Sequence, residues 1–261
     1  MRPENVKIMK ARRRNIRLTV AYDGTGYHGF QRQTPPVVAV QNILEDRLEK
    51  VFGDEIELAA AGRTDAGVHA WGQVVNFFTD GSIPVSRIVR AVNSLLPEDI
   101  VVRDAAEADH GFSARHSARH KTYIYRIQQG ETPNPFWARY SWYIRQPLSI
   151  EQMQKSLDIL KGEHDFSAFR AAGGADVSPV RILDEAVCEK KRQIIEIRLS
   201  ANGFLYHMVR NIVGTLVEVG KGKYTPEDFV GILASGNRQR AAATAPAAGL
   251  LFYKVEYGQA P

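Results

Sequence analysis

The chain has 261 residues, of which 34 are Lys or Arg and 29 are Asp or Glu, so its formal net charge is +5, and 44% of the residues are hydrophobic. This length suits one large domain or two small ones with a sizeable core, and 21 Gly and 12 Pro exclude a collagen-like or disordered chain. The single cysteine, Cys188, excludes an internal disulfide and a two-cysteine zinc site. A reducing, cytoplasmic location is expected, because there is no run of about 18 apolar residues and residues 1–17 lack the apolar core of a secretory signal.

Positive charge gathers in three stretches of the sequence. Residues 1–17 contain seven Lys and Arg and one acid, Glu4, and residues 1–15 are expected to form a flexible basic arm. Residues 110–130 and 197–217 contain no Asp or Glu, and in the first of these stretches basic residues are interleaved with aromatic ones. Such a surface offers cations to phosphates and rings to bases. A solvated charged face without any nucleic-acid partner explains the same composition.

The first part of the chain has the pattern of a β-α-β-β-α-β series. Alternating apolar residues predict strands at residues 16–22, 56–61, 73–78 and 100–103. Helical spacing of apolar residues predicts helices at residues 40–52 and 85–96, which end at Gly53 and Pro97. Residues 61–70, between the second and third strands, are too polar and glycine-rich for either kind of element, so they are expected to form a loop.

The second part repeats this order. Strands are predicted at residues 121–128, 180–189, 193–199 and 250–257. Helices are predicted after Ser149, which has the form of a capping box with Gln152, at residues 205–217, and after Thr225. The sequence therefore predicts an α+β fold of two ferredoxin-like (βαββαβ) halves, residues 16–112 and 113–261, which form a mixed, mainly antiparallel sheet with a central catalytic cleft.

One polar loop stands out as a candidate for chemistry. Residues 61–70, Ala-Gly-Arg-Thr-Asp-Ala-Gly-Val-His-Ala, place a single acid between two glycines and two predicted strands. Gly62 and Gly67 permit tight backbone paths and the close approach of a ligand. Asp65 is therefore expected at a loop tip, with Arg63 near enough to act on the same ligand. An ordinary Asp turn beside a surface arginine explains the pattern equally well.

Arg210 is a second candidate, because it lies among apolar positions of the predicted helix 205–217. A guanidinium beside a core needs a fixed anionic partner, since its desolvation is otherwise costly, and Asp65 is an eligible partner. Alternatively, Arg210 faces water one position away from the apolar stripe. His207 is more often structural than metal-binding in such a place, because no HxxxH or HxH spacing accompanies it. Walker-type glycine loops and Gly-x-Ser-x-Gly elbows are absent from the sequence.

Eight sequence strings, in the same order along the chain, connect it with one family. They are 22–33 (YDGTGYHGFQRQ), 61–70 (AGRTDAGVHA), 112–115 (FSAR), 121–125 (KTYIY), 164–166 (HDF), 178–181 (SPVR), 207–214 (HMVRNIVG) and 241–246 (AAATAP). Through these strings the chain resembles the TruA family of tRNA pseudouridine synthases over nearly its whole length. One departure is Phe30, where family members commonly have Trp, and the residues before Arg17 lie outside the resemblance.

The resemblance implies an enzyme that isomerises uridine to pseudouridine in the anticodon stem-loop of tRNA, at positions 38, 39 and 40. It also implies a homodimer that binds each tRNA across two subunits. Because the product is an isomer of the substrate, neither a cofactor nor a metal is expected. The target uridine has to be flipped out of its stack, which costs about a few kcal/mol.

The same resemblance implies roles for single residues. Asp65 corresponds to the catalytic carboxylate, Arg210 to the arginine that pairs with it, and Tyr123 to the tyrosine that contacts the uridine. Arg63 corresponds to the arginine that helps to displace the target base, and Leu250 to an apolar residue near the uracil. Three further residues are expected to bind the substrate: Arg115, His69 and Arg32.

Three other interpretations stay open at this point. A non-catalytic RNA-binding module would keep the basic and aromatic surface without needing the catalytic candidates. A synthase that acts on other uridines would keep the same catalytic residues, because substrate choice depends on shape recognition by the surrounding surface. A metal-dependent hydrolase would use His69, His164 and Asp165.

Overall fold

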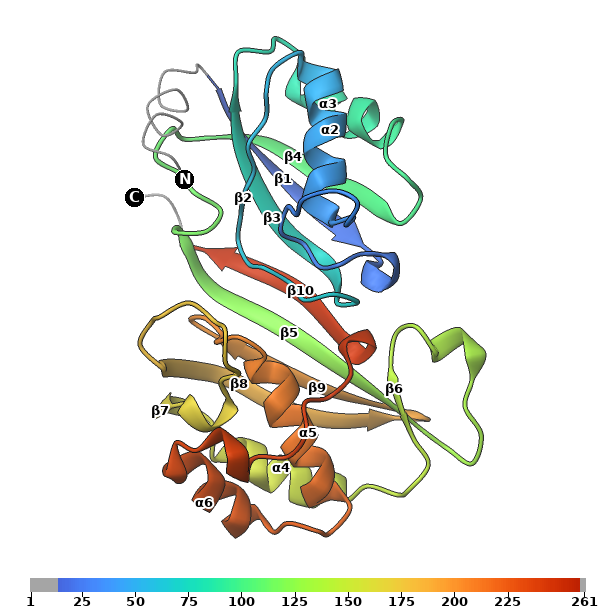
Figure 1. The fold of residues 1–261 in the computed structure, drawn as a ribbon, viewed down its shortest axis with the longest axis vertical. Helices are drawn as coiled ribbons and strands as arrows, with labels where there is room; N and C mark the ends of the chain where they lie inside the picture. The colour runs from blue at the N-terminus through green and yellow to red at the C-terminus, as the bar shows by residue number, and fades with distance from the viewer. Residues whose placement is uncertain (1–13, 259–261) are drawn as a thin grey trace. The chain divides into compact units, whose positions relative to one another are not determined.

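The computed structural model describes residues 14–258, and the chain divides into two compact units (Figure 1). Unit 1 consists of Met1–Ala118 and Phe252–Pro261, and unit 2 consists of Arg119–Leu251. Residues 113–118 and 252–258 thus belong with unit 1, whereas the sequence-based halves assign them to the second half. That division at residues 112 and 113 stays a prediction, and the expected basic arm, residues 1–15, lies outside the described residues except for its last two.

Unit 1 is built on a sheet in which β1 pairs antiparallel with a strand on each side. The strands in pairing order are β4 (Ile100–Ala108), β1 (Arg14–Tyr22), β3 (His69–Thr79) and the unit's part of β10 (Leu250–Tyr257), and the short β2 (Ala59–Ala60) pairs with β3. Ile16, Leu18 and Val20 are completely buried, because alternate side chains of a strand point to the same face. The apolar alternation that is visible in the sequence therefore places one face of β1 in the core.

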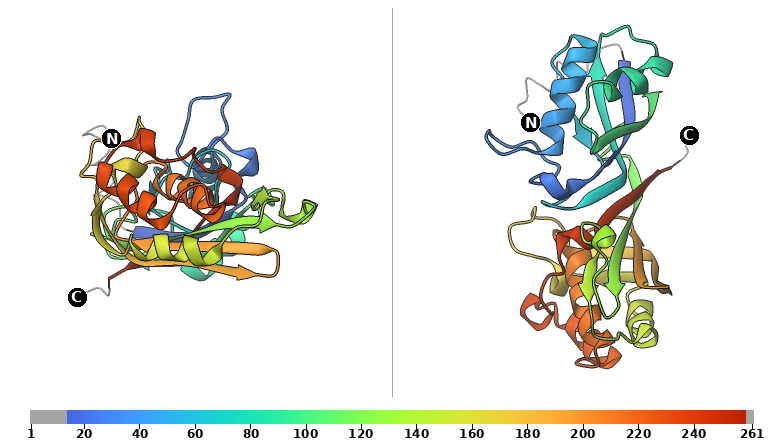
Figure 2. Two further views of the ribbon diagram at one scale, coloured as in Figure 1. Left: turned by 90° about the horizontal axis from the view of Figure 1, so that it is seen from below. Right: turned by 90° about the vertical axis from the view of Figure 1, so that its right-hand side faces the viewer.

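Two helices cover one face of this sheet, α2 (Val40–Phe52) and α3 (Val85–Asn93) (Figure 1; Figure 2, right). The predicted helix at residues 40–52 is confirmed, and Gly53 ends it with a φ of 74°. The helix predicted at residues 85–96 ends earlier, at Asn93, whose side chain exchanges two hydrogen bonds of 2.8 Å with the backbone of Val102 in β4.

The strand expected at residues 56–61 is reduced to β2, which is a correction with a visible cause. The backbone N–H groups of Ile56 and Leu58 donate to the side chains of Glu49 and Glu45 on α2, at 3.2 and 3.0 Å. Their partners are therefore carboxylates of a helix and not the backbone of a neighbouring strand.

Unit 2 contains the remaining strands, which are again mainly antiparallel. Its strands in pairing order are β5 (Ala118–Gln129), β9 (Ile194–Ala201), β8 (Val180–Lys191) and β7 (Gly162–Asp165), and the short β6 (Trp142–Ile144) pairs parallel with β5. β5, β8 and β9 confirm the predicted strands. β6 and β7 have no counterpart in the sequence prediction, because runs of three and four residues are too short to show a period of two.

The helices of unit 2 are α4 (Ile150–Asp158), α5 (Met208–Gly220) and α6 (Pro226–Ser235), and they pack against one another (Figure 1). The sequence suggests that α5 is amphipathic, but all of its residues except Arg210 and Glu218 are buried. The segment 241–246 covers its outer side, and a Cβ on Gly214 would lie only 1.9 Å from the Ala243 carbonyl oxygen. Among residues 14–258, no helix is both long enough and apolar enough to cross a membrane.

Two helix starts differ in how well the sequence predicts them. Thr225 and Asp228 form a complete capping box at the start of α6, with bonds of 3.1 and 2.9 Å. Ser149 accepts a bond from the Gln152 N–H at 3.4 Å, but its own N–H donates to the Gly220 carbonyl at 2.8 Å. The capping box expected at Ser149 is therefore only half formed, because α5 supplies the second partner.

Candidate active site

The loop that carries Asp65 joins β2 to β3 in unit 1 and is held on both sides of this residue. Thr64 Oγ1 lies 2.7 Å from Tyr22 Oη, and the Thr64 carbonyl accepts the Phe30 N–H at 3.0 Å. After Asp65, the Val68 N–H donates to the Asp65 carbonyl at 3.1 Å and closes a turn. The backbone around Asp65 is thus fixed by hydrogen bonds within unit 1.

The segment 22–30 packs directly against this loop. Gly29 has a φ of 89°, and a Cβ there would lie 2.7 Å from the Thr64 carbonyl oxygen, so both the conformation and the close approach require glycine. The Gly67 N–H donates to the Tyr27 carbonyl at 3.3 Å. Two strings that are far apart in the sequence therefore build one structural element.

Side chains of the loop alternate in exposure. Thr64 is buried against Tyr22, whereas Asp65 is partly exposed and Arg63 is exposed. Burial raises the pKa of Tyr22, so its hydroxyl stays protonated and remains available for the bond to Thr64. The loop thus holds the exposed Arg63 and the partly exposed Asp65 on a backbone fixed by hydrogen bonds, as a reactive carboxylate needs.

His69, an expected substrate contact, lies in the interior of the same element. It is 5% exposed, its Nδ1 accepts the Gly24 N–H at 3.0 Å, and the same atom lies 3.1 Å from Asp23 Oδ1. Asp23 Oδ1 also accepts the Thr25 N–H at 2.9 Å. His69 therefore has a structural role in joining residues 23–25 to β3, and its role in substrate binding stays a prediction.

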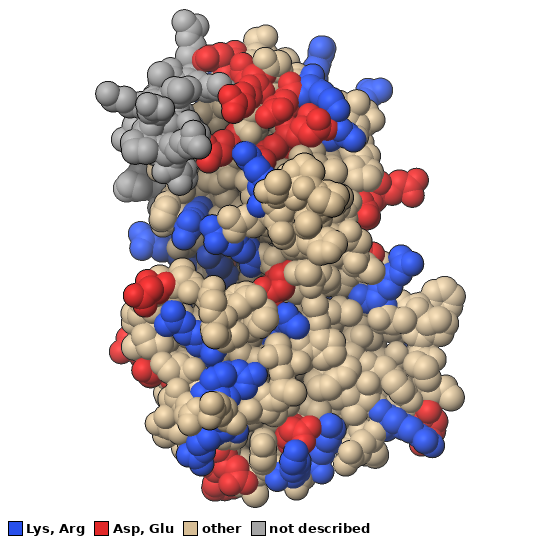
Figure 3. All heavy atoms as spheres, in the orientation of Figure 1, with Lys and Arg blue, Asp and Glu red and all other residues tan. Residues whose placement is uncertain are grey.

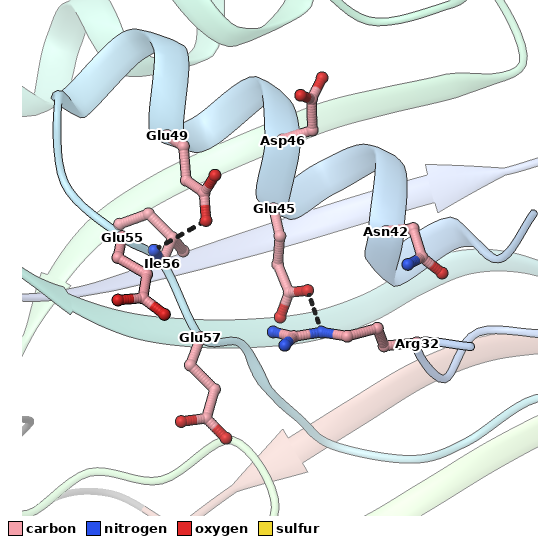
Figure 4. Close-up of a pocket in the computed structure, with 8 residues that line it drawn as sticks. All are labelled: Arg32, Asn42, Glu45, Asp46, Glu49, Glu55, Ile56 and Glu57. Atoms are coloured by element: carbon pink, nitrogen blue, oxygen red, sulfur yellow. Dashed lines mark hydrogen bonds and ion pairs between the residues drawn. The ribbon is translucent and has the colours of Figure 1, made fainter. Parts of the chain in front are cut away.

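Arg32 lies in different surroundings, at the edge of a hollow beside α2 (Figure 4). Its Nε is 2.7 Å from Oε2 of the buried Glu45, and this hydrogen bond raises the pKa of Arg32. The hollow, of about 260 Å³, is lined mainly by carboxylates: Glu45, Asp46, Glu49, Glu55 and Glu57. Because carboxylates repel phosphate, these surroundings favour a structural role for Arg32 over the expected contact with RNA.

Arg115 lies in an exposed turn that two buried asparagines hold in place. Asn76 Oδ1 accepts the Ala114 N–H at 2.8 Å, and Asn76 Nδ2 donates to Asn15 Oδ1 at 2.9 Å. Asn15 Nδ2 donates in turn to the Phe112 carbonyl at 3.0 Å. The sequence analysis missed both asparagines. The one signal that could have found them is a polar residue at a position where a strand is expected to be buried.

In unit 2, Arg210 extends from the buried helix α5. Its Nε donates to the Ala245 carbonyl at 2.8 Å, the Ala245 N–H donates to the Arg210 carbonyl at 3.1 Å, and Nη1 lies 3.4 Å from His207 Nε2. The guanidinium is thus oriented by a neutral carbonyl next to the core of unit 2. The expected pairing of Arg210 with Asp65 stays a prediction.

The segment beside Arg210 is fixed by a polar cluster that the sequence analysis did not single out. Asn211 Oδ1 accepts hydrogen bonds from Thr244 Oγ1 at 2.7 Å and from Arg238 Nη2 at 3.0 Å. Asn211 Nδ2 donates to the Phe169 carbonyl at 2.8 Å. These contacts explain why two separated strings, 207–214 and 241–246, occur together: the first is a helix face and the second is its cover.

Tyr123 on β5 and Leu250 at the start of β10 both belong to unit 2. Tyr123 and Tyr125 are two residues apart on β5 and so share a face, and Tyr125 donates to the Pro246 carbonyl at 2.8 Å. The chain then leads from Pro246 to the buried Leu250. The Tyr123 ring is 8% exposed and meets Phe204 edge to face at 5.1 Å. The segment 245–250 therefore contacts Arg210 through Ala245 and contacts Tyr125, the neighbour of Tyr123 on one face of β5, through Pro246.

The described part of the chain offers no cluster for a metal ion. Among residues 14–258 there is no group of three or more His, Cys, Asp or Glu side chains that could hold one. His164 Nε2 lies 3.1 Å from the Lys161 carbonyl, and Asp165 accepts the Ser167 N–H at 2.7 Å. The hydrolase interpretation with His69, His164 and Asp165 therefore lacks a ligand set.

Comparisons with known proteins identify the family. The family model described as "tRNA pseudouridine synthase" matches residues 18–116 and 157–258. The chain is 46% identical over 244 residues to tRNA pseudouridine synthase A of Thermoanaerobacter sp. (strain X514), which covers 94% of this chain and 100% of that protein. It is 44% identical over 247 residues to the protein of the same name from Moorella thermoacetica, with 93% and 99% covered.

The fold and these matches define an isomerase of the pseudouridine synthase class. The chain belongs to the tRNA pseudouridine synthase family, whose reaction converts uridine to pseudouridine in tRNA. Its similarity to a solved structure of an H/ACA RNP bound to a substrate RNA containing 2′-deoxyuridine is much weaker. That match has a TM-score of 0.38 and 11% identity, and covers 84% of this chain and 45% of the other.

Proposed function

We propose that this protein forms pseudouridine at positions 38, 39 and 40 in the anticodon stem-loop of tRNA, with Asp65 as the catalytic carboxylate. The observation that supports it most is the loop geometry: hydrogen bonds fix the backbone on both sides of Asp65, while Arg63 is exposed and Asp65 is partly exposed. The family match supports the reaction class, and the positions in tRNA follow from the resemblance of the sequence strings.

The reaction breaks the C1′–N1 bond, turns the uracil and joins C1′ to C5. An ionised Asp65 can contribute by attacking C1′, by adding to C6 of the base, or by removing a proton from C2′ to form a glycal. Each route balances without an oxidant or reductant, because the proton lost from C5 at the end is the only one released from the base. Tyr123 is proposed to stack on the uracil and to assist that proton transfer through its hydroxyl.

The remaining candidates are assigned to binding. Arg63, exposed two residues before Asp65, is proposed to occupy the space left by the flipped uridine, which offsets part of the cost of unstacking. Arg210 is proposed as the cation beside the Asp65 carboxylate, with Leu250 packing near the uracil and Arg115 contacting phosphate. We also propose that the protein is a homodimer, which sedimentation of the purified chain would test. We propose further that it acts in the cytoplasm.

Replacement of the carboxylate tests this assignment. Asp65→Asn keeps the size of the side chain and removes its charge, so tritium release from tRNA labelled at C5 of uridine is expected to fall by roughly 10⁴-fold, with tRNA affinity retained. Asp104→Asn, at an exposed aspartate of β4 in the same unit, is the matched control and should keep full activity. Substantial turnover by Asp65→Asn would remove Asp65 from the mechanism.

A further inference from the structure

Unit 2 has a hollow of its own, of about 410 Å³, next to the short helix η3 (Ser167–Phe169). Its lining consists of Ser167, Arg170, the four residues 171–174 and Arg238, without a single Asp or Glu. The nearby Asp165 is bound to the Ser167 N–H at 2.7 Å. In contrast to the carboxylate-lined hollow of unit 1, this one presents guanidinium groups and small residues.

Both arginines of the hollow are held by neutral oxygens. Arg170 donates to the carbonyls of Ala175 at 2.7 Å and Val177 at 3.3 Å. Arg238 donates to the Ala242 carbonyl at 3.0 Å and to Asn211 Oδ1 at 3.0 Å. Within residues 14–258, neither guanidinium forms an ion pair with a carboxylate. Carbonyl and amide oxygens orient these groups without neutralising them, so both arginines line the hollow as cations.

A third arginine, Arg181, adds positive charge near Arg170. Arg181 donates to the Ser178 carbonyl at 2.7 Å, so Arg170 and Arg181 hold the segment 175–178 from both ends. Burial and the positive charge of Arg170 lower the pKa of Arg181, and burial also lowers the pKa of Arg238. Cations placed close together and partly out of water are a favourable site for an anion, which relieves both the repulsion and the desolvation.

The walls of the hollow contact two residues close to Arg210 in the sequence, Tyr206 and Asn211. The Ala171 N–H donates to the Tyr206 carbonyl at 3.0 Å, and a Cβ on Gly174 would lie 2.8 Å from Tyr206 Cβ. On the other wall, Arg238 binds Asn211, the residue that follows Arg210 on α5. An anion in the hollow is therefore bound by the same scaffold that positions Arg210.

We propose that this hollow binds a phosphodiester group of the RNA backbone while the target uridine is held at the active site. The inference rests on the proposed function and extends it from the reacting base to the neighbouring backbone. Guanidinium groups match the oxygens of a phosphate with two parallel hydrogen bonds, and phosphate contacts supply most of the salt-dependent affinity for nucleic acid. The small residues 171–174 let the backbone of the RNA come close.

The salt dependence of tRNA affinity tests this proposal. Arg170→Gln is expected to reduce the slope of log affinity against log salt by about 0.7 to 0.9, the value for one phosphate. Arg170→Lys keeps the charge and should keep the slope. The matched control is Arg145→Gln, because Arg145 is 73% exposed and is already paired with Glu131 at 2.9 Å; its slope should equal that of the unchanged protein.

A second variant separates charge from structure, since Arg170 also holds the segment 175–178. Ala172→Glu places a carboxylate at the exposed rim of the hollow without removing a side-chain hydrogen bond. It should weaken tRNA binding by about tenfold while leaving the melting temperature unchanged. The proposal requires both the reduced slope in Arg170→Gln and the weaker binding in Ala172→Glu, and it fails if either is missing or if Arg145→Gln has the same effect.

Titration of the full chain with inorganic phosphate, followed by ³¹P NMR, distinguishes RNA from a free ligand. Binding of phosphate that is lost in Arg170→Gln, together with an unchanged tRNA slope, would assign the hollow to a small phosphate and contradict the proposal. If the unchanged protein forms no pseudouridine, the proposed function fails, whereas the tRNA slopes still decide the question of the hollow. If it has no tRNA affinity, both proposals fail.

Discussion

Each of the two units combines mainly antiparallel strands with helices, but the units differ in net charge. Unit 2, residues 119–251, contains 18 Lys and Arg against 13 Asp and Glu, whereas the rest of the chain contains 16 of each. The whole net charge of +5 therefore comes from unit 2. In the face seen in Figure 3, Asp and Glu gather on unit 1 between α2 and the segment that follows it, and Lys and Arg predominate on unit 2.

The contrast extends to the hollows and to the candidate residues. Unit 1 has a hollow lined by glutamates and presents one carboxylate, Asp65, on a rigid loop. Unit 2 has a hollow lined by arginines and carries Arg210 and Tyr123. We infer a division of labour in which unit 1 supplies the reactive carboxylate and unit 2 supplies most of the cationic surface for RNA. Variants in each unit, compared for their effects on catalysis, RNA binding and stability, test this division directly.

The largest effect in unit 2 is expected from Arg210→Ala. Pseudouridine formation should fall by roughly 10²- to 10³-fold if Arg210 supports an ionised Asp65. The free energy of unfolding should fall by about 1–3 kcal/mol, because the buried Ala245 carbonyl loses its donor. Single-turnover rates and thermal melts measure the two effects. Arg240→Ala, at an exposed arginine of the same unit, is the control, and an unchanged rate and melting temperature in Arg210→Ala would contradict the assignment.

A smaller effect on binding, with a clear effect on stability, is expected from Asn76→Ala in unit 1. The change leaves the buried Ala114 N–H and Asn15 Oδ1 without their partner, which costs about 2 kcal/mol. The turn that carries Arg115 should loosen, so tRNA affinity should decline by a few-fold. Asn42→Ala removes hydrogen bonds that are exposed and should cost less than about 0.5 kcal/mol. Equal denaturation midpoints for the two variants would show that the network is unimportant.

The smallest effect is expected from Arg32→Gln. The side chain of Arg32 is 51% exposed and its partner Glu45 keeps hydrogen bonds to the Leu58 N–H and Gln41, so the loss of stability should be at most about 1 kcal/mol. The salt slope of tRNA binding should not change, in contrast to Arg170→Gln. A reduced slope would show that Arg32 contacts RNA, as the sequence alone suggested.

Local patterns predicted most elements of both units. The apolar spacing and Gly53 were sufficient to place α2, and Thr225 with Pro226 was sufficient to place the start of α6. These signals lie within a few residues of one another, so the sequence contains them completely. The Gly-Arg-Thr-Asp-Ala-Gly string likewise identified the loop that carries Asp65, because its glycines and polar residues cannot continue a strand.

What the sequence could not provide depends on contacts between distant segments. Helix α5 has an amphipathic pattern, yet both sides are buried because residues 241–246 cover it. Asn15, Asn76 and Asn211 each hold a loop more than thirty residues away along the chain. His69 and Arg32 stand in strings that carry the family resemblance. The hydrogen bond of His69 to the Gly24 N–H and the ion pair of Arg32 with Glu45 assign both side chains first to the fold of unit 1.

Mapping of pseudouridine in a tRNA transcript tests the central claim most directly. The transcript carries uridine at positions 38, 39 and 40, and is incubated with the purified chain and, separately, with Asp65→Asn. The account predicts pseudouridine at these positions with the unchanged protein and none with Asp65→Asn. Pseudouridine only at other positions, none at all, or equal amounts with the two proteins would contradict it.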